Sequence, residues 1–175
     1  MASISSFWED NGAAVGSPPR GTTRVQGRSE VNFKNIDDST TAYSSSPITT
    51  GNNSYSKWQF LALTGSFNTI SNGKFWHSTG ILGNGLTILF TGTSGYSTPS
   101  TTSLGATAMN ITIPSGTAAA SQTILFGTAG PEAANASTVT TSGYTQYCAL
   151  QMLTTSAASP GDTSTCTFSL SFDES

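Results

Sequence analysis

Short runs of alternating apolar and polar residues, separated by Gly, Pro, Asn and Ser, recur from residue 30 to the end of the chain. Alternation with a period of two places apolar side chains on one face of a strand, and the residues between the runs are typical of turns. No stretch keeps a helical spacing of apolar residues for three turns. The pattern predicts strands over 30–36, 55–63, 66–70, 74–78, 86–90, 108–114 and 122–127, and within 144–155 and 163–175.

Many short strands with turn signals between them are typical of an all-β fold, here an antiparallel two-sheet sandwich of the jelly-roll or immunoglobulin-like kind. The single helical turn that the sequence favours lies in 130–137, where Pro131 and Glu132 stand near its start. The apolar strand positions predict the core: Phe33, Trp58, Phe60, Leu61, Phe67, Phe75, Ile88, Phe90, Ile111, Ile113, Leu150, Phe168 and Leu170.

Both cysteines stand on the predicted apolar faces of the last two runs. A hairpin centred near Ala157 would place Cys148 and Cys166 opposite each other, within reach of a disulfide if the register allows it. Free cysteine is among the most buried residue types, so we expect two packed thiols and keep the bridge as the alternative. No metal site is expected, because two cysteines and the remote His77 cannot supply four ligands.

The first 28 residues show neither strand alternation nor helical period around the adjacent rings of Phe7 and Trp8. We therefore divide the chain into an extended N-terminal arm, residues 1–28, and a β-sandwich domain, residues 29–175. In the arm, Phe7 and Trp8 are predicted to anchor a partner, because buried aromatic residues dominate interface energetics. Arg20, Arg24 and Arg28 recur every four residues, which on an extended segment places them on one side, and this common face is predicted to meet neighbouring carboxylates. The alternative is a disordered leader.

Charge is scarce in this sequence of 175 residues: 9% of them are charged, the net charge is −3, and Ser and Thr make up about a third. The six basic residues all lie in the first 74 positions, without the dense basic face that nucleic-acid binding requires. Neither a membrane-spanning run nor a signal-peptide pattern is present. We expect a protein that uses no nucleic acid and no membrane and is made and kept in the cytoplasm.

Catalytic patterns are weak. His77 lies in a predicted strand beside Phe75 and Trp76, and is more simply a structural residue than a general base. Asp37 and Asp38 could hold a cation or form an acid–base pair, but adjacent strand residues point to opposite faces, and "DDST" favours a turn. "GILGNGLTILFTG" lacks the Lys and the helix of a phosphate-binding loop. We expect no enzymatic activity and no cofactor.

The run "FKNIDDSTTAYSSSPITTGNNSYSKWQFLALTGSFNTISNGKFWHSTG", followed by "YSTPSTTS" and "AMNITIPSG", resembles small β-sandwich structural proteins of tailed-bacteriophage particles. The resemblance lies in the general composition and pattern of these residues and includes no catalytic or binding motif. It implies a virion protein, assembled in the host cytoplasm, that occupies a surface as a homo-oligomer or in many copies. The expected function is capsid decoration or cementing, with attachment through the N-terminal arm and the sandwich edge and with the major capsid protein or other virion subunits as partners. A neck, tail or baseplate component is the alternative position.

Two other classes of function remain open. A carbohydrate- or receptor-binding sandwich would use exposed aromatic residues as stacking platforms, and the candidates are Trp58, Trp76, Tyr96 and Tyr144. A hydrolase would need Asp37 or Asp38 to converge with Glu30 in a pocket. Exposure of the rings and the placement of these carboxyl groups therefore separate the alternatives.

Overall fold

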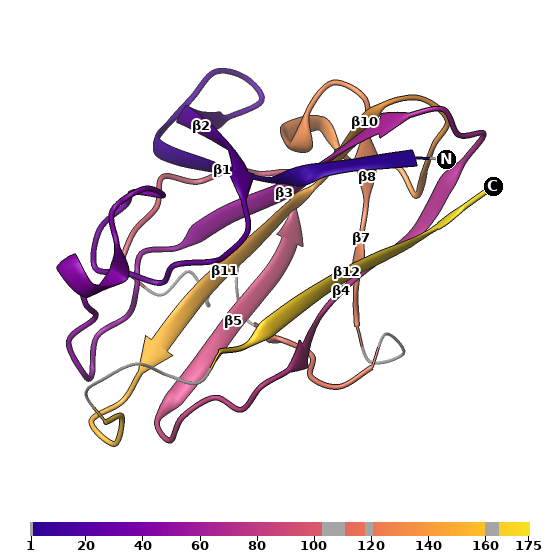
Figure 1. Ribbon diagram of the computed structural model, residues 1–175. Coiled ribbons are helices and arrows are strands. Elements are labelled where there is room, and N and C mark those ends of the chain that lie inside the picture. Colours follow the sequence, from indigo (N-terminus) through magenta and orange to yellow (C-terminus); the bar gives the residue numbers. More distant parts are fainter. Residues whose placement is uncertain (1, 103–110, 118–120, 160–164) are drawn as a thin grey trace.

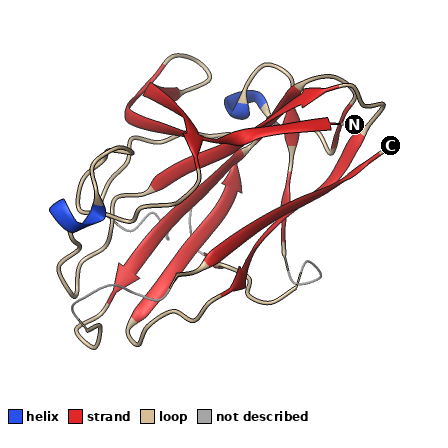
Figure 2. Ribbon diagram, in the orientation of Figure 1, coloured by secondary structure: helices blue, strands red, loops and turns tan. Residues whose placement is uncertain are grey.

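The computed structural model describes residues 2–102, 111–117, 121–159 and 165–175, which form two antiparallel β-sheets (Figures 1 and 2). The all-β two-sheet fold predicted from the sequence is confirmed. Among the described residues, the helical segments are two short 3-10 turns, Tyr43–Ser45 and Pro131–Ala133. The second of them lies in the predicted helical stretch.

The described strands form a larger and a smaller sheet. The larger sheet has the order β2-β1-β3-β11-β5-β6, and β10 joins it by pairing with both β3 and β8. Its strands are β1 Ala2–Val15, β2 Arg20–Arg28, β3 Lys57–Gly65, β5 Leu86–Thr93, β6 Ile111–Thr112, β8 Phe126–Gly127, β10 Gly143–Thr145 and β11 Tyr147–Thr154. The smaller sheet has the order β12-β4-β7, with β9 also pairing with β4. Its strands are β4 Ile70–Thr79, β7 Gln122–Ile124, β9 Thr138–Val139 and β12 Thr167–Glu174.

The main core lies between the sheets, where Phe75 of β4 stacks on Phe90 of β5 with ring centroids 4.9 Å apart. Most of the predicted core is confirmed as buried: Trp58, Phe60, Leu61, Phe75, Ile88, Phe90, Ile113 and Leu150. The partly buried members are Phe33, Phe67, Phe168 and Leu170. The side chain of Ile111 lies outside the described part of the structure.

Two local strand predictions are wrong. Residues 30–36 form no strand, and the predicted strands 66–70 and 74–78 are replaced by the single strand β4. The predicted turn Ser71-Asn72-Gly73 lies inside β4, where Asn72 has a φ of 53°. The pairing of β4 with β12 shifts register between Ser171 and Asp173, opposite this point. An irregularity of this kind accommodates turn-forming residues without ending the strand.

The C-terminal hairpin predicted from 144–175 is also wrong, because its two strands belong to different sheets. β11 pairs with β3 and β5 in the larger sheet, whereas β12 pairs with β4 in the smaller one. Both strands present an apolar face to the same core, but from opposite sides, which period-two alternation alone cannot distinguish from a hairpin. Cys148 is buried and Cys166 is partly buried, and both are free thiols.

The boundary predicted at residue 28 is wrong. β1 and β2 form a hairpin, and β1 pairs along β3 with Phe7 opposite Leu61 and Trp8 opposite Phe60. The segment Gly16–Pro19, which suggested an extended arm, is the turn between β1 and β2. Residues 2–28 are therefore part of the sandwich, and β2 is one edge of its larger sheet (Figure 1).

Candidate functional site

Phe7 and Trp8 point to opposite faces of β1, as adjacent strand residues must. Phe7 packs between the sheets with the cluster that contains Leu61. Trp8 packs on the other face, with its ring centroid 5.8 Å from that of Phe60 and 6.2 Å from that of Tyr144. The two rings thus pack within the chain's own domain, and the prediction that they anchor a free arm is wrong.

The next two residues, Glu9 and Asp10, place negative charge at the junction where the β1–β2 hairpin packs against the rest of the sandwich. Each is only 1% exposed. Glu9 lies on the same face of β1 as Phe7, and Asp10 lies on the same face as Trp8. Because a buried carboxylate is costly unless it is paired, each face must supply its own partners.

Asp10 is held by two residues that are distant in the sequence. Arg24 of β2 donates from Nε and Nη2 to the two carboxylate oxygens, over 2.7 Å and 2.8 Å. Tyr147 of β11 donates its hydroxyl to Oδ2 over 2.6 Å. The hydrogen bonds with Asp10 raise the pKa of Arg24 above its ordinary value, and the guanidinium also lies over the Phe60 ring, 4.7 Å from its centroid. Charge and aromatic packing therefore fix the edge strand β2 through a side chain that lies on the outer face of the sheet.

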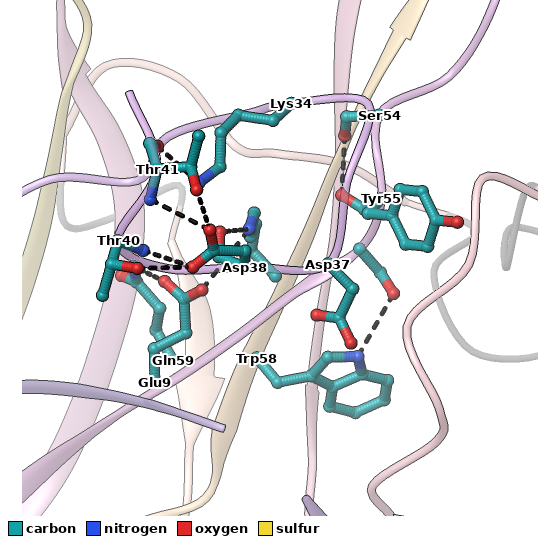
Figure 3. A network of polar contacts seen from close by, with 12 residues as sticks. Glu9, Lys34, Asp37, Asp38, Thr40, Thr41, Ser54, Tyr55, Trp58 and Gln59 are labelled. Carbon is teal, nitrogen blue, oxygen red and sulfur yellow. Dashed lines mark hydrogen bonds and ion pairs between the residues drawn. The ribbon is translucent and has the colours of Figure 1, made fainter. Parts of the chain in front are cut away.

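Glu9 is held on the inner face by two residues of β3. Lys57 Nζ lies 3.4 Å from Glu9 Oε1, and Gln59 Nε2 donates to Oε2 over 3.1 Å. Lys57 is itself 1% exposed and also donates to the carbonyl of Asp38 over 3.0 Å. Figure 3 shows Glu9 beside Gln59 and close to the loop that carries Asp38. This ion pair joins β1, β3 and the loop.

The loop at residues 34–41 covers that ion pair with its own polar contacts. Lys34, which is fully buried, donates to the carbonyl of Thr41 over 2.7 Å, and burial lowers its pKa. Asp38 accepts hydrogen bonds from the backbone and hydroxyl groups of Thr40 and Thr41. These bonds, above all that from the Thr41 hydroxyl, lower the pKa of Asp38. The turn predicted from "DDST" is confirmed.

Asp37 connects the same loop to the hairpin. Its Oδ2 accepts a hydrogen bond of 2.7 Å from the backbone N–H of Gly12. Asn11, with its amide oriented to suit its neighbours, donates to Glu9 Oε1 over 3.0 Å and to Asp37 Oδ1 over 3.1 Å. Burial raises the pKa of Asp37 above its ordinary value. The structure thus brings Asp37 to Glu9.

Two glycines let the hairpin approach this closely. Gly12 has a φ of +85°, a conformation that other L-residues rarely adopt. Gly21 is buried against β1, where an added Cβ would lie 2.6 Å from the carbonyl oxygen of Asn11. Larger residues at these positions would push β2 away from the buried pair of Asp10 and Arg24.

The three arginines predicted to form one binding face are separated in the structure. Arg24 is committed to Asp10, and Arg20 is exposed at the start of β2. Arg28 lines a groove of about 380 Å³ together with Phe7, Phe33, Phe75 and Phe168, among others. Its Nε is buried without a hydrogen-bond partner. The prediction of a common arginine face is therefore wrong.

The junction is arranged to hold structure together. Glu30 lines the groove beside Arg28, and neither Asp37 nor Asp38, the residues that a hydrolase would bring to it, is among the lining residues of that groove. Another cavity, of about 580 Å³, lies between Gly65–Asn68, Thr140–Ser142 and the end of β12, and Glu174 is the only carboxylate side chain among its described lining residues. Within the described ranges, no three His, Cys, Asp or Glu side chains gather to hold a metal ion.

Sequence reasoning missed Lys57, Gln59 and Tyr147 as partners of the hairpin. The run "KWQFLAL" contains a usable signal, since Lys57 and Gln59 alternate with Leu61 and Leu63 on one face. A lysine on the apolar face of a central strand requires an acidic partner from elsewhere in the chain. "FWED" contains the matching alternation, with Phe7 and Glu9 on one face and Trp8 and Asp10 on the other.

Comparisons with models of known protein families, with characterised proteins and with solved structures give no match. No helix in the described part of the chain is long and apolar enough to cross a membrane. The function is therefore argued from the geometry of this chain.

Proposed function

We propose that the protein is a non-enzymatic structural subunit of a virus particle, a decoration or cement protein that attaches to a tailed-phage capsid through the sandwich. The composition and pattern of residues 30–116 resemble those of such subunits and suggest this class. With the hairpin β1–β2 built into the larger sheet, attachment is assigned to the outer surface and edges of the sandwich.

The proposal rests on the position of the few charged residues, several of which are buried and paired inside the sandwich. The chain has six basic and nine acidic residues, and Glu9, Asp10, Lys34 and Lys57 are completely or almost completely buried. They bind the hairpin to β3, to β11 and to the loop at residues 34–41. Figure 3 shows the part of this network around Glu9, Lys34 and Asp38. A surface rich in hydroxyl groups and poor in charge suits a subunit that packs beside many identical neighbours, because it attracts few unrelated charged partners.

The test is to look for the chain in particles of the phage that encodes it. Mass spectrometry of purified particles is expected to detect it in many copies, and antibody labelling in electron micrographs is expected to mark the head. Purified protein should also co-sediment with particles that lack it. Labelling of the neck, tail or baseplate would move the proposal to that part of the virion. Absence from purified particles would overturn it.

A glycan-binding sandwich is the second candidate, and the placement of Trp76 favours it. Trp58 and Tyr96 are buried and cannot stack on a sugar, and Tyr144 packs against Trp8 and Phe60. Trp76 is partly exposed and alternates with the buried Phe75 and His77, so it faces outward on the smaller sheet.

A glycan array tests this second candidate. If Trp76 is a stacking platform, the wild-type chain should bind one or more glycans, and Trp76→Ala should abolish binding without changing the melting temperature. Tyr43→Ala is the matched control, because Tyr43 is an exposed ring far from the smaller sheet in sequence. No binding by the wild type, or equal loss in both variants, would rule out the platform.

A further inference from the structure

β12 is an edge strand with an open side. Within the described residues it pairs only with β4, and no strand lies on its other side. Natural proteins usually protect such an edge with Lys, Pro or a covering segment. From Phe168 to Phe172, β12 contains no charged residue and no proline. This edge is therefore suited to pairing with another strand.

The groove of about 380 Å³ lies beside the start of this edge. It is lined by residues of both sheets, including Phe75 of β4, Ile88 of β5, Met152 of β11 and Phe168 of β12. Phe168 and Leu170 pack only partly against the main core, and Phe172 packs partly against the neighbouring cluster. A strand added along β12 would extend this apolar inner face over the mouth of the groove.

The sequence of β12 is complementary to itself in one antiparallel register. Residues directly opposite each other in an antiparallel pair lie on the same face of a sheet. If Leu170 lies opposite Leu170 of a second copy, Phe168 lies opposite Phe172, and Ser169 opposite Ser171. Moving the two-fold axis to Ser169 or Ser171 would leave one apolar residue of each copy opposite Cys166 or Glu174. The register centred on Leu170 alone pairs all three apolar side chains with one another.

The distribution of charge also favours a second copy of the chain as the partner of β12, in the same register. In this arrangement Asp173 of the second copy lies opposite Thr167, a residue that lines the groove together with Arg28. Oδ2 of Asp173 accepts a hydrogen bond from Asn72 of its own chain over 2.6 Å, which leaves its Oδ1 to face the groove. The Nε of Arg28 is buried without a hydrogen-bond partner, so its guanidinium can donate to a carboxylate brought into the groove. The two-fold axis also keeps the acidic ends of the two strands at opposite ends of the paired segment. An approaching copy thus supplies both the apolar strand and the anion.

We propose that the chain forms a two-fold symmetric dimer in which β12 pairs antiparallel with β12 of a second copy around Leu170. The two smaller sheets then form one continuous sheet, and the groove of each copy is covered by the partner strand. A two-fold axis perpendicular to the sheet keeps the inner faces of both copies on the same side. This dimer does not depend on the proposed place of the protein in a virus particle.

Charge pairing across the axis tests the register. Ser169→Glu/Ser171→Glu and Ser169→Lys/Ser171→Lys each place like charges opposite each other in a homodimer, and both variants should sediment at the monomer mass of 18.0 kDa. The wild type should sediment at twice that mass. An equimolar mixture of the two variants places Glu opposite Lys at every pair and should restore the dimer. The matched control is Thr23→Glu/Gln26→Glu, at exposed positions of the edge strand β2, and it should remain dimeric.

Arg28 provides an independent test of the same interface. Arg28→Gln should raise the dimer dissociation constant about tenfold, because it removes a charge-assisted contact from each half of the interface. Arg20→Gln, on the exposed start of the same strand, should leave the constant unchanged. The effect of Arg28→Gln should diminish as salt is raised, since charge contacts near a surface are screened.

Several results would overturn the proposal. A wild-type chain that stays monomeric at high micromolar concentration has no such interface. A dimer that persists in both charged variants uses another surface. If the charged variants do not fold, hydrogen exchange of the wild type decides: amides of Phe168–Phe172 should be protected more strongly as concentration rises, and unchanged protection would exclude pairing at β12.

Discussion

The two edge strands β2 and β12 lie on different sheets and differ in how they are protected. β2 carries Arg20, Arg24 and Arg28, and its pairing with β1 shifts register twice. Through Arg24 it is also bound to the buried carboxylate of Asp10. β12 carries no basic residue, and its apolar side chains are only partly buried. One edge is closed by charge and internal bonds, and the other offers unprotected backbone.

This difference indicates where the scarce charges of the chain act. They stabilise the side of the sandwich that the sequence pattern separates as an arm, and they are absent from residues Phe168–Phe172 of the open edge. The expected effects of substitutions at the two edges differ accordingly.

The largest expected effect is that of removing residues 1–28, which tests whether the protected edge belongs to the domain. We expect the truncated chain to lose its cooperative thermal transition. Deletion exposes the side of β3 that pairs with β1 and leaves the buried Lys57 without Glu9. Differential scanning calorimetry and circular dichroism measure the transition. If the truncated chain melts within a few degrees of the full chain, residues 1–28 are a separable arm and not part of the domain.

Asp10→Ala tests the buried bonds of the same edge. We expect a loss of about 2–4 kcal/mol in the free energy of unfolding, because the hydrogen bonds to the buried carboxylate are lost. The Arg24 side chain is 25% exposed and keeps Glu132 at 3.4 Å, so it is not left as an uncompensated buried charge. Tyr147 loses its acceptor in the same variant. Arg20→Ala is the matched control on β2 and should change stability by less than about 0.5 kcal/mol. Urea denaturation compares them, and similar values would mean that the buried pair adds nothing to stability.

Phe168→Ala at the open edge should cost less than Phe75→Ala on the adjacent strand. Phe75 is 2% exposed, and emptying such a site costs about 3–5 kcal/mol. Phe168 is only partly buried and lines the groove, so we expect about 1–2 kcal/mol in the monomer. The comparison is made by urea denaturation at a concentration where the chain is monomeric. A larger loss at Phe168 would show that β12 is as tightly packed as β4.

The smallest expected effect is a pH dependence of the folding stability at Asp37, which contacts the β1–β2 hairpin. The folded-state pKa of Asp37 is raised by burial, so its charged form destabilises the fold at neutral pH and this cost disappears as pH falls through that pKa. Asp37→Asn should therefore be at least as stable as the wild type at pH 7. Its advantage should shrink toward pH 4, as measured by urea denaturation across this range. An advantage that grows on acidification would mean that the sign is wrong.

Asp38 acts in the opposite direction within the same pH series. Its folded-state pKa is lowered, chiefly by the hydroxyl of Thr41, so it stabilises the fold above the ordinary aspartate pKa of about 4. That contribution is lost as pH falls further. In Asp38→Asn the loss of stability below about pH 4 should be shallower than in the wild type.

The sequence was sufficient to predict the fold class because alternation with a period of two survives in "KWQFLAL", "LTILF" and "TFSLSF". It was insufficient for the partners of those strands. The apolar face of β12 is the same whether the strand pairs with β11 or with β4. Only the position of the other strands decides between them, and that information is not local.

The sequence pattern predicts an arm in place of the hairpin for a related reason. Gly12, Gly16, Pro18 and Pro19 are strand breakers by propensity, yet here they provide the turn and the close approach of β2. Tertiary contacts outweigh such propensities. The pairing of Glu9 with Lys57 spans 48 residues, so neither residue alone indicates the site.

The hydrogen bond from Tyr147 to Asp10 joins residues 137 positions apart and has a consequence for folding during synthesis. β1 leaves the ribosome before β3, its neighbour in the larger sheet, which follows dozens of residues later, and β11 follows long after both. Contacts this distant in sequence form slowly, because a long loop must close before they stabilise the chain. The nascent chain therefore holds Trp8 without Tyr144, and Asp10 without Tyr147, until the segment with β10 and β11 has emerged. The β1–β2 hairpin is synthesised early but completes its contacts only at that later stage.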